Sequence, residues 1–144
     1  MSRPPYAPQR VVPMLVYRDA PAAIEFLRKA FGFSELYRLD MEDGRVGHAE
    51  LEYEGNVLAL ASVYAELGFA SPQDTNGIHC SLLWYVDDVD AHYRRALAAG
   101  ATVVGEPTDQ SYGDRSYRAL DPEGGRWVFA TRLREVAPQD MLKS

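Results

Sequence analysis

The sequence predicts an α+β fold built from two tandem βαβββ units. The first observation is a strand-like apolar run followed by a capped amphipathic helix, which occurs twice. The capping residues of the two helices, Asp19 and Asp88, lie 69 positions apart. The second observation is that three further strand-like stretches follow each helix. Because the order of elements and the helix lengths agree in both halves, we interpret the chain as an internal duplication.

In the first half, residues 11–17 form an apolar run rich in β-branched and aromatic residues, which is typical of a buried strand. Asp19 and Pro21 are helix-start signals, and Gly32 is a helix-stop signal. Between them the apolar residues recur at helical spacing. The stretches predicted as the next three strands are 34–41, 45–53 and 56–62.

The second half repeats this order, with a strand at 79–86 and a helix between Asp88 and Gly100. The predicted apolar stripe of this helix consists of Val89, Tyr93, Ala96 and Leu97. The strands that follow are predicted at 102–107, 116–120 and 126–131. Matching Gly55 with Gly125 aligns the last two strands of each half at an offset of 70. That offset equates Leu58 with Val128 and His48 with Arg118.

We predict one domain, residues 1–144, in which the two units share a core. The first unit covers about 10–62, and a linker rich in glycine and turn residues covers 63–77. The second unit covers about 78–133, and residues 134–144 form a short tail that we expect to fray.

Composition excludes several classes of protein. The 144 residues are 47% hydrophobic and 25% charged, as in an ordinary globular protein. A net charge of −6 argues against nucleic acid and anionic membranes as partners. The single cysteine, Cys80, excludes a disulfide framework and a multi-thiolate metal site. No apolar run is long enough to span a membrane, and the first residues lack a signal-peptide core, so we expect a cytoplasmic protein.

Three segments carry a family resemblance: VYRDAPAAIEFLRKAFGF, WYVDDVDAHYRRALAAGATVV and GDRSYRALDPEGGRW. With them, residues 10–133 resemble the vicinal-oxygen-chelate superfamily of glyoxalases, bleomycin-resistance proteins and extradiol dioxygenases, and most closely its PhnB-like branch. The resemblance implies curved mixed sheets around a cup that holds the ligand, and a homodimer. It also implies one metal ion in the cup for the enzymes of the superfamily.

The resemblance places the four metal ligands of the superfamily at Val12, Leu58, Ser81 and Val128. Valine and leucine offer no lone pair, and one hydroxyl cannot hold a divalent cation with useful affinity. Shifting the alignment by one residue in either direction does not place a histidine or a carboxylate at any of the four positions. We therefore predict no metal at the usual site. Gly125 is a second departure, because branches with the pattern DPFGHRW carry histidine there.

Strand alternation predicts which side chains face the cup. Its floor would be apolar, formed by Val12, Leu58, Leu83 and Val128, while Trp84, Trp127 and Cys80 would pack beneath the helices. The candidate ligand-binding residues are His48, Glu50, His79, Ser81, Tyr85, Arg115, Arg118 and Arg126. The alternative for His48, Glu50 and Glu52 is an ordinary solvated strand face. A displaced metal site of His48, Glu50 and His79 is a further alternative.

The leading functional hypothesis is a metal-free protein that binds an aromatic or cationic small molecule in the cup of a homodimer. The alternative is an enzyme, a lyase, isomerase or dioxygenase-like member of the family. It would use a displaced metal or an acid–base pair such as His79 with Glu50. A third hypothesis is an interaction module without a ligand. Whether the chain is an enzyme is left open by the sequence.

Overall fold

A four-stranded mixed sheet with one helix on one of its faces is the building block of both halves of the chain. The computed structural model describes residues 9–78 and 80–142. The chain divides into Met1–Gly77, the first unit, and Ile78–Ser144, the second unit. No helix among the described residues has the length and apolar character needed to cross a bilayer.

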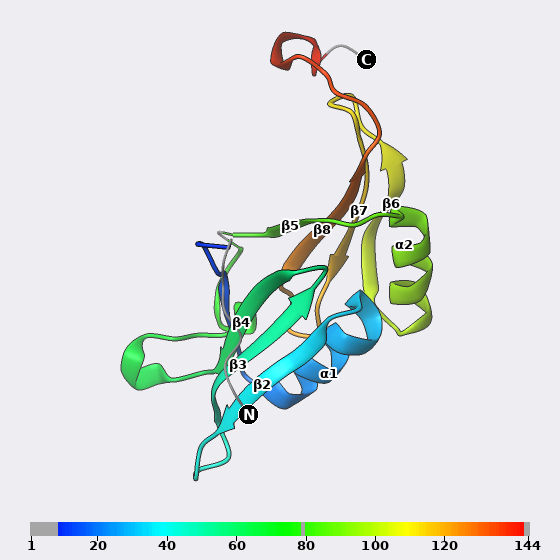
Figure 1. The fold of residues 1–144 in the computed structure, drawn as a ribbon. Coiled ribbons are helices and arrows are strands. Elements are labelled where there is room, and N and C mark those ends of the chain that lie inside the picture. Colours follow the sequence, from blue (N-terminus) through cyan, green and yellow to red (C-terminus); the bar gives the residue numbers. More distant parts are fainter. Residues whose placement is uncertain (1–8, 79, 143–144) are drawn as a thin grey trace. The chain divides into compact units, whose positions relative to one another are not determined.

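In the first unit the strand order is β1-β4-β3-β2. Strand β1 runs parallel to β4, and the other neighbours are antiparallel. Helix α1 lies along one face of this sheet (Figure 1). The elements are β1 (Met14–Tyr17), α1 (Ala20–Phe31), β2 (Ser34–Asp40), β3 (Val46–Tyr53) and β4 (Asn56–Ser62).

Helix α1 begins and ends where its sequence signals predict. The Asp19 carboxylate accepts a hydrogen bond from the Ala22 backbone N–H at 3.1 Å, which satisfies a donor of the first turn. Gly32 ends the helix in the left-handed conformation. Ile24, Leu27 and other apolar residues of the predicted stripe are buried. Local capping and periodicity therefore fix this element.

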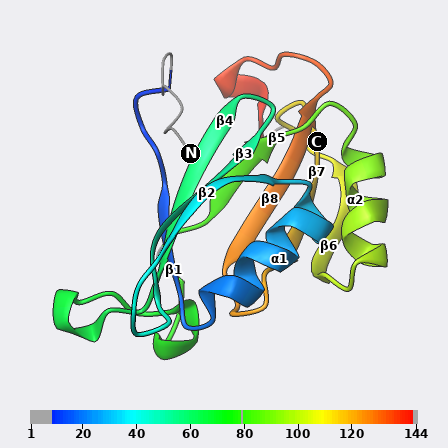
Figure 2. The same ribbon diagram turned by 60° about the horizontal axis from the view of Figure 1, so that its bottom comes forward.

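The second unit repeats the order, with strands arranged β5-β8-β7-β6 and β5 parallel to β8. Helix α2 lies along one face of its sheet (Figure 2). The elements are β5 (Leu82–Tyr85), α2 (Val89–Ala98), β6 (Thr102–Asp109), β7 (Asp114–Leu120) and β8 (Arg126–Arg132). This architecture confirms the predicted pair of βαβββ units.

The first strand of each unit is shorter than predicted. Strand β1 begins at Met14 because Pro13 has no N–H to donate to the sheet, although its carbonyl accepts from Ala59. Strand β5 begins at Leu82, since its pairing with β8 starts with Leu82 opposite Trp127. The residues before these points therefore do not obey strand alternation.

The offset of 70 between the halves is wrong. Met14 pairs with Ala59 and Leu83 pairs with Val128, so matching Met14 with Leu83 relates β1 and β4 to β5 and β8 by 69. Ala59 in turn pairs with Glu50, and Val128 with Arg118, so the same matching relates β3 to β7 by 68. Tyr53 pairs with Asn56 across a turn of two residues, whereas Leu120 pairs with Arg126 across a turn of five, so matching the turn glycines misaligns the strands.

Two consequences follow for predicted positions. Arg118 is equivalent to Glu50, not to His48. Leu58 pairs with Leu51 and is buried on the helix side of its sheet, so its predicted place on the cup floor is wrong. The other side of β4 carries Val57 and Ala59, which offer no metal ligand either.

The apolar stripe of α2 also differs from the prediction. Val89, His92 and Ala96 are its buried residues, whereas Leu97 is 50% exposed. The ring of His92 packs on Phe129 with centroids 4.1 Å apart, and its Nδ1 lies 2.6 Å from the Tyr117 hydroxyl. A hydrogen-bonded histidine thus occupies the position that hydropathy assigns to an apolar residue.

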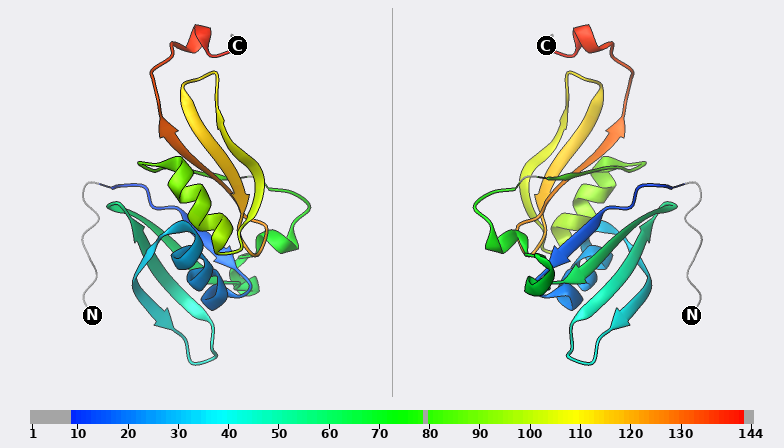
Figure 3. Two further views of the ribbon diagram at one scale, coloured as in Figure 1. Left: turned by 90° about the vertical axis from the view of Figure 1, so that its right-hand side faces the viewer. Right: turned by 90° about the vertical axis from the view of Figure 1, so that its left-hand side faces the viewer.

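The chain after β8 makes hydrogen bonds with the β6–β7 hairpin. The Gly113 carbonyl, at the tip of the β6–β7 hairpin, accepts hydrogen bonds from the backbone N–H groups of Leu133 and Arg134 at 2.9 and 3.2 Å. A Cβ at Gly113 would collide with the Arg134 carbonyl oxygen, so glycine permits this close approach. The Ser111 hydroxyl donates to the Met141 carbonyl farther along. Figure 3 shows the chain after β8 passing the hairpin tip.

Candidate functional site

The sheet of the second unit has one face beneath α2 and one face without a helix. Along β7, Tyr117 and Ala119 are buried on the α2 side, so Arg118 points to the opposite side. Arg118 pairs with Val128, and Val128 pairs with Leu83, which places all three side chains on one face. We call this side, defined by Leu83, Arg118 and Val128, the helix-free face.

A hollow of about 360 Å³ lies on this face, where β8 begins. Among the described residues, its lining consists of these members of the second unit: Ile78, Cys80, Ser81, Arg118, Arg126, Trp127 and Val128. The structure therefore brings together three of the predicted ligand-binding residues, Ser81, Arg118 and Arg126, around an apolar Val128. Pockets for small molecules usually have this composition, with apolar walls and a few convergent polar groups.

The charge of the hollow is positive. No carboxylate belongs to its lining. Within the described part of the chain, neither Arg118 nor Arg126 has a side-chain hydrogen bond or ion pair, whereas Arg115 and Arg132 in the same unit both pair with aspartates. Two guanidinium groups, each a planar fork of N–H donors, are thus available to a bound anion.

The prediction that Cys80 packs inertly beneath a helix is wrong. Cys80 is exposed and lines the hollow, because β5 starts only at Leu82 and alternation cannot be extended back to it. Trp127 is buried, as predicted, and its indole N–H donates to the Asp121 carboxylate at 3.0 Å. Trp84 pairs with Phe129 and lies on the α2 side.

Tyr85 lies on the helix-free face beyond Leu83, opposite Ala130. Its hydroxyl donates to the buried Asp114 carboxylate at 2.8 Å and accepts from the Arg132 guanidinium at 2.9 Å. Arg132 also pairs with Asp114, and the hydrogen bond to that carboxylate raises the pKa of Arg132. The ring is thereby held in place although the residue is 46% exposed.

Asp114 and Arg132 are not predicted from the sequence as partners of Tyr85. The signal that could have found Asp114 is alternation along β7, because Asp114, Ser116 and Arg118 share one side of that strand. Ser116 is buried there and accepts a hydrogen bond from Gln110 at 3.3 Å. No comparable local signal indicates that Asp114 is buried, since its burial depends on neighbouring strands.

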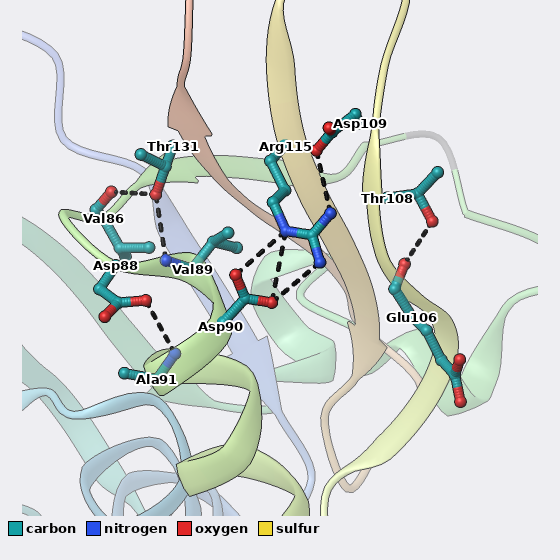
Figure 4. Close-up of polar contacts among 10 residues, drawn as sticks. All are labelled: Val86, Asp88, Val89, Asp90, Ala91, Glu106, Thr108, Asp109, Arg115 and Thr131. Carbon is teal, nitrogen blue, oxygen red and sulfur yellow. Dashed lines mark hydrogen bonds and ion pairs between the residues drawn. The ribbon is translucent and has the colours of Figure 1, made fainter.

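Arg115 is not brought to the hollow. Figure 4 shows its guanidinium beside Asp90 of α2 and Asp109 at the end of β6. Arg115 Nε lies 3.0 Å from an Asp90 oxygen, and Nη1 lies 2.9 Å from Asp109. The hydrogen bond from Arg115 lowers the pKa of Asp90. Arg115 thus joins α2 to the β6–β7 hairpin, on the side of the sheet that α2 covers.

In the first unit, Glu50 is a buried carboxylate between two aromatic side chains. Its Oε2 accepts a hydrogen bond from the Tyr37 hydroxyl at 2.9 Å and lies 2.9 Å from His48 Nε2. The expected alternative of a solvated strand face is wrong for Glu50, whose fractional exposure is 1%. Burying a carboxylate is costly, so these polar contacts are needed to hold it there.

His79 lies outside the described residues, so the proposed pairing of His79 with Glu50 stays a prediction. The displaced metal site of His48, Glu50 and His79 stays one for the same reason. Among the residues that the structure describes, no three His, Cys, Asp or Glu side chains are grouped to hold a metal ion. At the positions that the resemblance assigns to the metal, Val12, Leu58 and Val128 have no donor atom and Ser81 is exposed. The described residues thus do not fit the metal of the superfamily's enzymes.

Comparison with known proteins identifies the family. A description of the Glyoxalase/Bleomycin resistance protein/Dioxygenase superfamily matches residues 10–129. An uncharacterised protein of Mycobacterium tuberculosis is 39% identical over 127 residues, which are 86% of this chain and 75% of that protein.

Among solved structures, TioX from Micromonospora sp. ML1 is similar, with a TM-score of 0.70 and 31% identity over 87% of this chain and 99% of TioX. A glyoxalase/bleomycin resistance protein/dioxygenase family enzyme from Burkholderia phytofirmans has a TM-score of 0.66 and 27% identity. That match covers 83% of this chain and 95% of the enzyme. The homodimer and the PhnB-like branch stay predictions.

Proposed function

We propose that this chain, which belongs to the Glyoxalase/Bleomycin resistance protein/Dioxygenase superfamily, binds a small anionic molecule in the hollow of its second unit. The observation that supports this most directly is the pair of arginines, Arg118 and Arg126, in a hollow whose lining has no carboxylate. The chain as a whole carries a net charge of −6, yet this hollow holds two arginines without an acidic partner in the part of the chain that the structure describes.

The lining favours an anion over the cationic ligand expected from the sequence. A guanidinium group binds a carboxylate or phosphate through two parallel hydrogen bonds, and such charge-assisted bonds are about twice as strong as neutral ones. A cationic ligand would instead meet two like charges, which is unfavourable. An aromatic or apolar body is still compatible with the apolar lining residues Ile78 and Val128.

We propose binding without chemistry at this hollow. Its polar groups are two guanidinium groups, a hydroxyl and a thiol, and arginine is not a proton acceptor at neutral pH. The lining therefore offers recognition and orientation more readily than general acid–base catalysis.

Replacing either hollow arginine should weaken anion binding. The probe is anilinonaphthalene sulfonate, a fluorescent aromatic anion, titrated into the wild-type protein and into Arg118→Gln and Arg126→Gln. Each substitution removes a charge-assisted contact worth about 1.5 to 3 kcal/mol, so the dissociation constant should rise at least tenfold. Binding should also weaken as salt is added.

The matched control is Arg115→Gln. Arg115 lies on β7, as Arg118 does, but it pairs with Asp90 and lies away from the hollow. Its affinity for the probe should equal that of the wild type. A second readout is alkylation of Cys80, the single cysteine, by iodoacetamide, which the bound probe should slow. Equal affinities in all three variants would reject the proposal.

A second candidate function, acid–base catalysis in the first unit, is favoured by one observation. The buried Glu50 carboxylate lies within hydrogen-bond distance of both Tyr37 and His48. A carboxylate that orients an imidazole is a common arrangement for a general base. In this alternative His48 removes a proton from a carbon next to a carbonyl, and Glu50 stabilises the imidazolium that forms.

This candidate predicts hydrogen exchange into hydroxyacetone in D₂O, followed by NMR. The wild type should accelerate the exchange of the carbon-bound hydrogens, and His48→Gln and Glu50→Gln should each reduce the rate about 100-fold or more. Glu52→Gln is the control, since Glu52 accepts from the Gly55 N–H and takes no part in the cluster. If the wild type does not exceed the buffer rate, the candidate fails for this substrate class.

A further inference from the structure

The helix-free face continues from the hollow as a strip formed by the half-buried Val128 and the exposed side chains of Leu83 and Tyr85. Arg126 lies at the start of β8, Val128 lies two residues on, and Ala130, which is buried, lies opposite Tyr85. Leu83 flanks Val128 and is 55% exposed. Ala130 is the fourth residue after Arg126, and four steps of strand span about 13 Å along the sheet.

The two ends of this strip differ in chemistry. At one end, Arg118 and Arg126 offer positive charge without an acid partner among the described residues. At the other end, the Tyr85 ring is fixed by Asp114 and Arg132, so its exposed surface is a rigid aromatic platform. Large exposed apolar residues that adjoin a polar hollow are typical of ligand-binding surfaces.

We infer that the ligand of the proposed binding site is an elongated amphipathic anion, of the class of medium-chain or aromatic carboxylates. Its carboxylate binds Arg118 and Arg126, its apolar body covers Val128 and Leu83, and its far end contacts the Tyr85 ring. This inference rests on the proposed function and adds the length and polarity of the ligand to it. Charge complementarity at one end fixes the direction in which the molecule lies.

The inference predicts that affinity depends on chain length. Butanoate, octanoate and dodecanoate carry the same charge and are titrated calorimetrically into the full chain. Each methylene that the strip removes from water should tighten binding about two- to fourfold. The gain should level off between octanoate and dodecanoate, because the strip ends at Tyr85. Octanol, with an apolar chain but no charge, should bind at least tenfold more weakly than octanoate.

Two exposed leucines of the second unit provide a matched pair of variants. Leu83 is 55% exposed on the strip, and Leu97 is 50% exposed on α2. Leu83→Ser should weaken octanoate about tenfold and leave butanoate nearly unchanged, whereas Leu97→Ser should change neither. Tyr85→Ala should weaken dodecanoate more than butanoate. Circular dichroism of each variant verifies that the fold is retained.

The outcomes separate this inference from the proposed function. If butanoate and octanoate bind alike while Arg118→Gln weakens both, the hollow binds anions and the elongated ligand is wrong. If Arg118→Gln weakens no carboxylate, or octanol binds as well as octanoate, the proposed function fails too. If Leu83→Ser changes the oligomeric state in light scattering but not the dependence on chain length, a second copy covers the strip and the inference is overturned.

Discussion

Asp121→Ala is expected to destabilise the protein by about 3 kcal/mol. Asp121 is buried in the turn before β8, and its carboxylate satisfies three donors. The Gly125 and Glu123 backbone N–H groups donate to Oδ1 at 2.8 and 3.1 Å, and the Trp127 indole donates to Oδ2 at 3.0 Å. Alanine removes all three acceptor contacts in a place that water does not fill readily. Urea denaturation followed by tryptophan fluorescence measures the loss.

Two further variants test the reason for this effect. Asp121→Asn keeps the shape but turns one N–H₂ group toward a donor, so we expect an intermediate loss of about 2 kcal/mol. Asp109→Ala removes an exposed carboxylate that pairs with Arg115, and it should cost less than 1 kcal/mol. Equal losses for Asp109→Ala and Asp121→Ala would show that the buried hydrogen bonds do not stabilise the turn.

The same turn gives a structural reason for glycine at position 125, where the sequence differs from the family pattern. Gly125 stands where related branches carry histidine, and a Cβ at this position would collide with the Asp121 carboxylate. The glycine thus permits the rotamer in which Asp121 reaches both the backbone and Trp127. No local pattern in the sequence reveals this, because the contact depends on the conformation of the turn.

The elements that local chemistry determines could be predicted from the sequence. The capped helix after Asp19 and the strand segments at 34–40 and 56–62 agree with the structure. The register between the halves could not, since the turn before the last strand differs in length between the units and its glycines are therefore not equivalent. That error moved Leu58 onto the wrong face and equated Arg118 with the wrong residue of the first unit.

The candidate site was predictable only where strand alternation applies. Arg118 and Arg126 lie on regular strands, and alternation placed both on the side where the hollow lies. Cys80 precedes its strand, so the rule misplaced it. The burial of Glu50 and Asp114 depends on side chains from other strands, and a single strand read by itself carries no signal for it.

The second large effect on stability is expected in helix α2. There a polar residue, His92, is buried and an apolar residue, Leu97, is exposed, which is the reverse of what hydropathy predicts. His92→Ala should cost about 3 kcal/mol, since it leaves a cavity beside Phe129 and removes the hydrogen bond with Tyr117. Leu97→Ala should cost less than 0.5 kcal/mol, because half of the leucine is already in water. Urea denaturation of both variants tests whether the burial of a residue or its hydropathy determines how much it contributes to the free energy of unfolding.

His92→Phe separates packing from hydrogen bonding at the same position. Phenylalanine keeps a ring of similar shape against Phe129 but cannot bond to the Tyr117 hydroxyl, so we expect a loss of about 1 kcal/mol. The predicted order of destabilisation is therefore His92→Ala, then His92→Phe, then Leu97→Ala. If Leu97→Ala proves the most destabilising, the apolar stripe that the sequence indicates would face the core, and the orientation of α2 described above would be wrong.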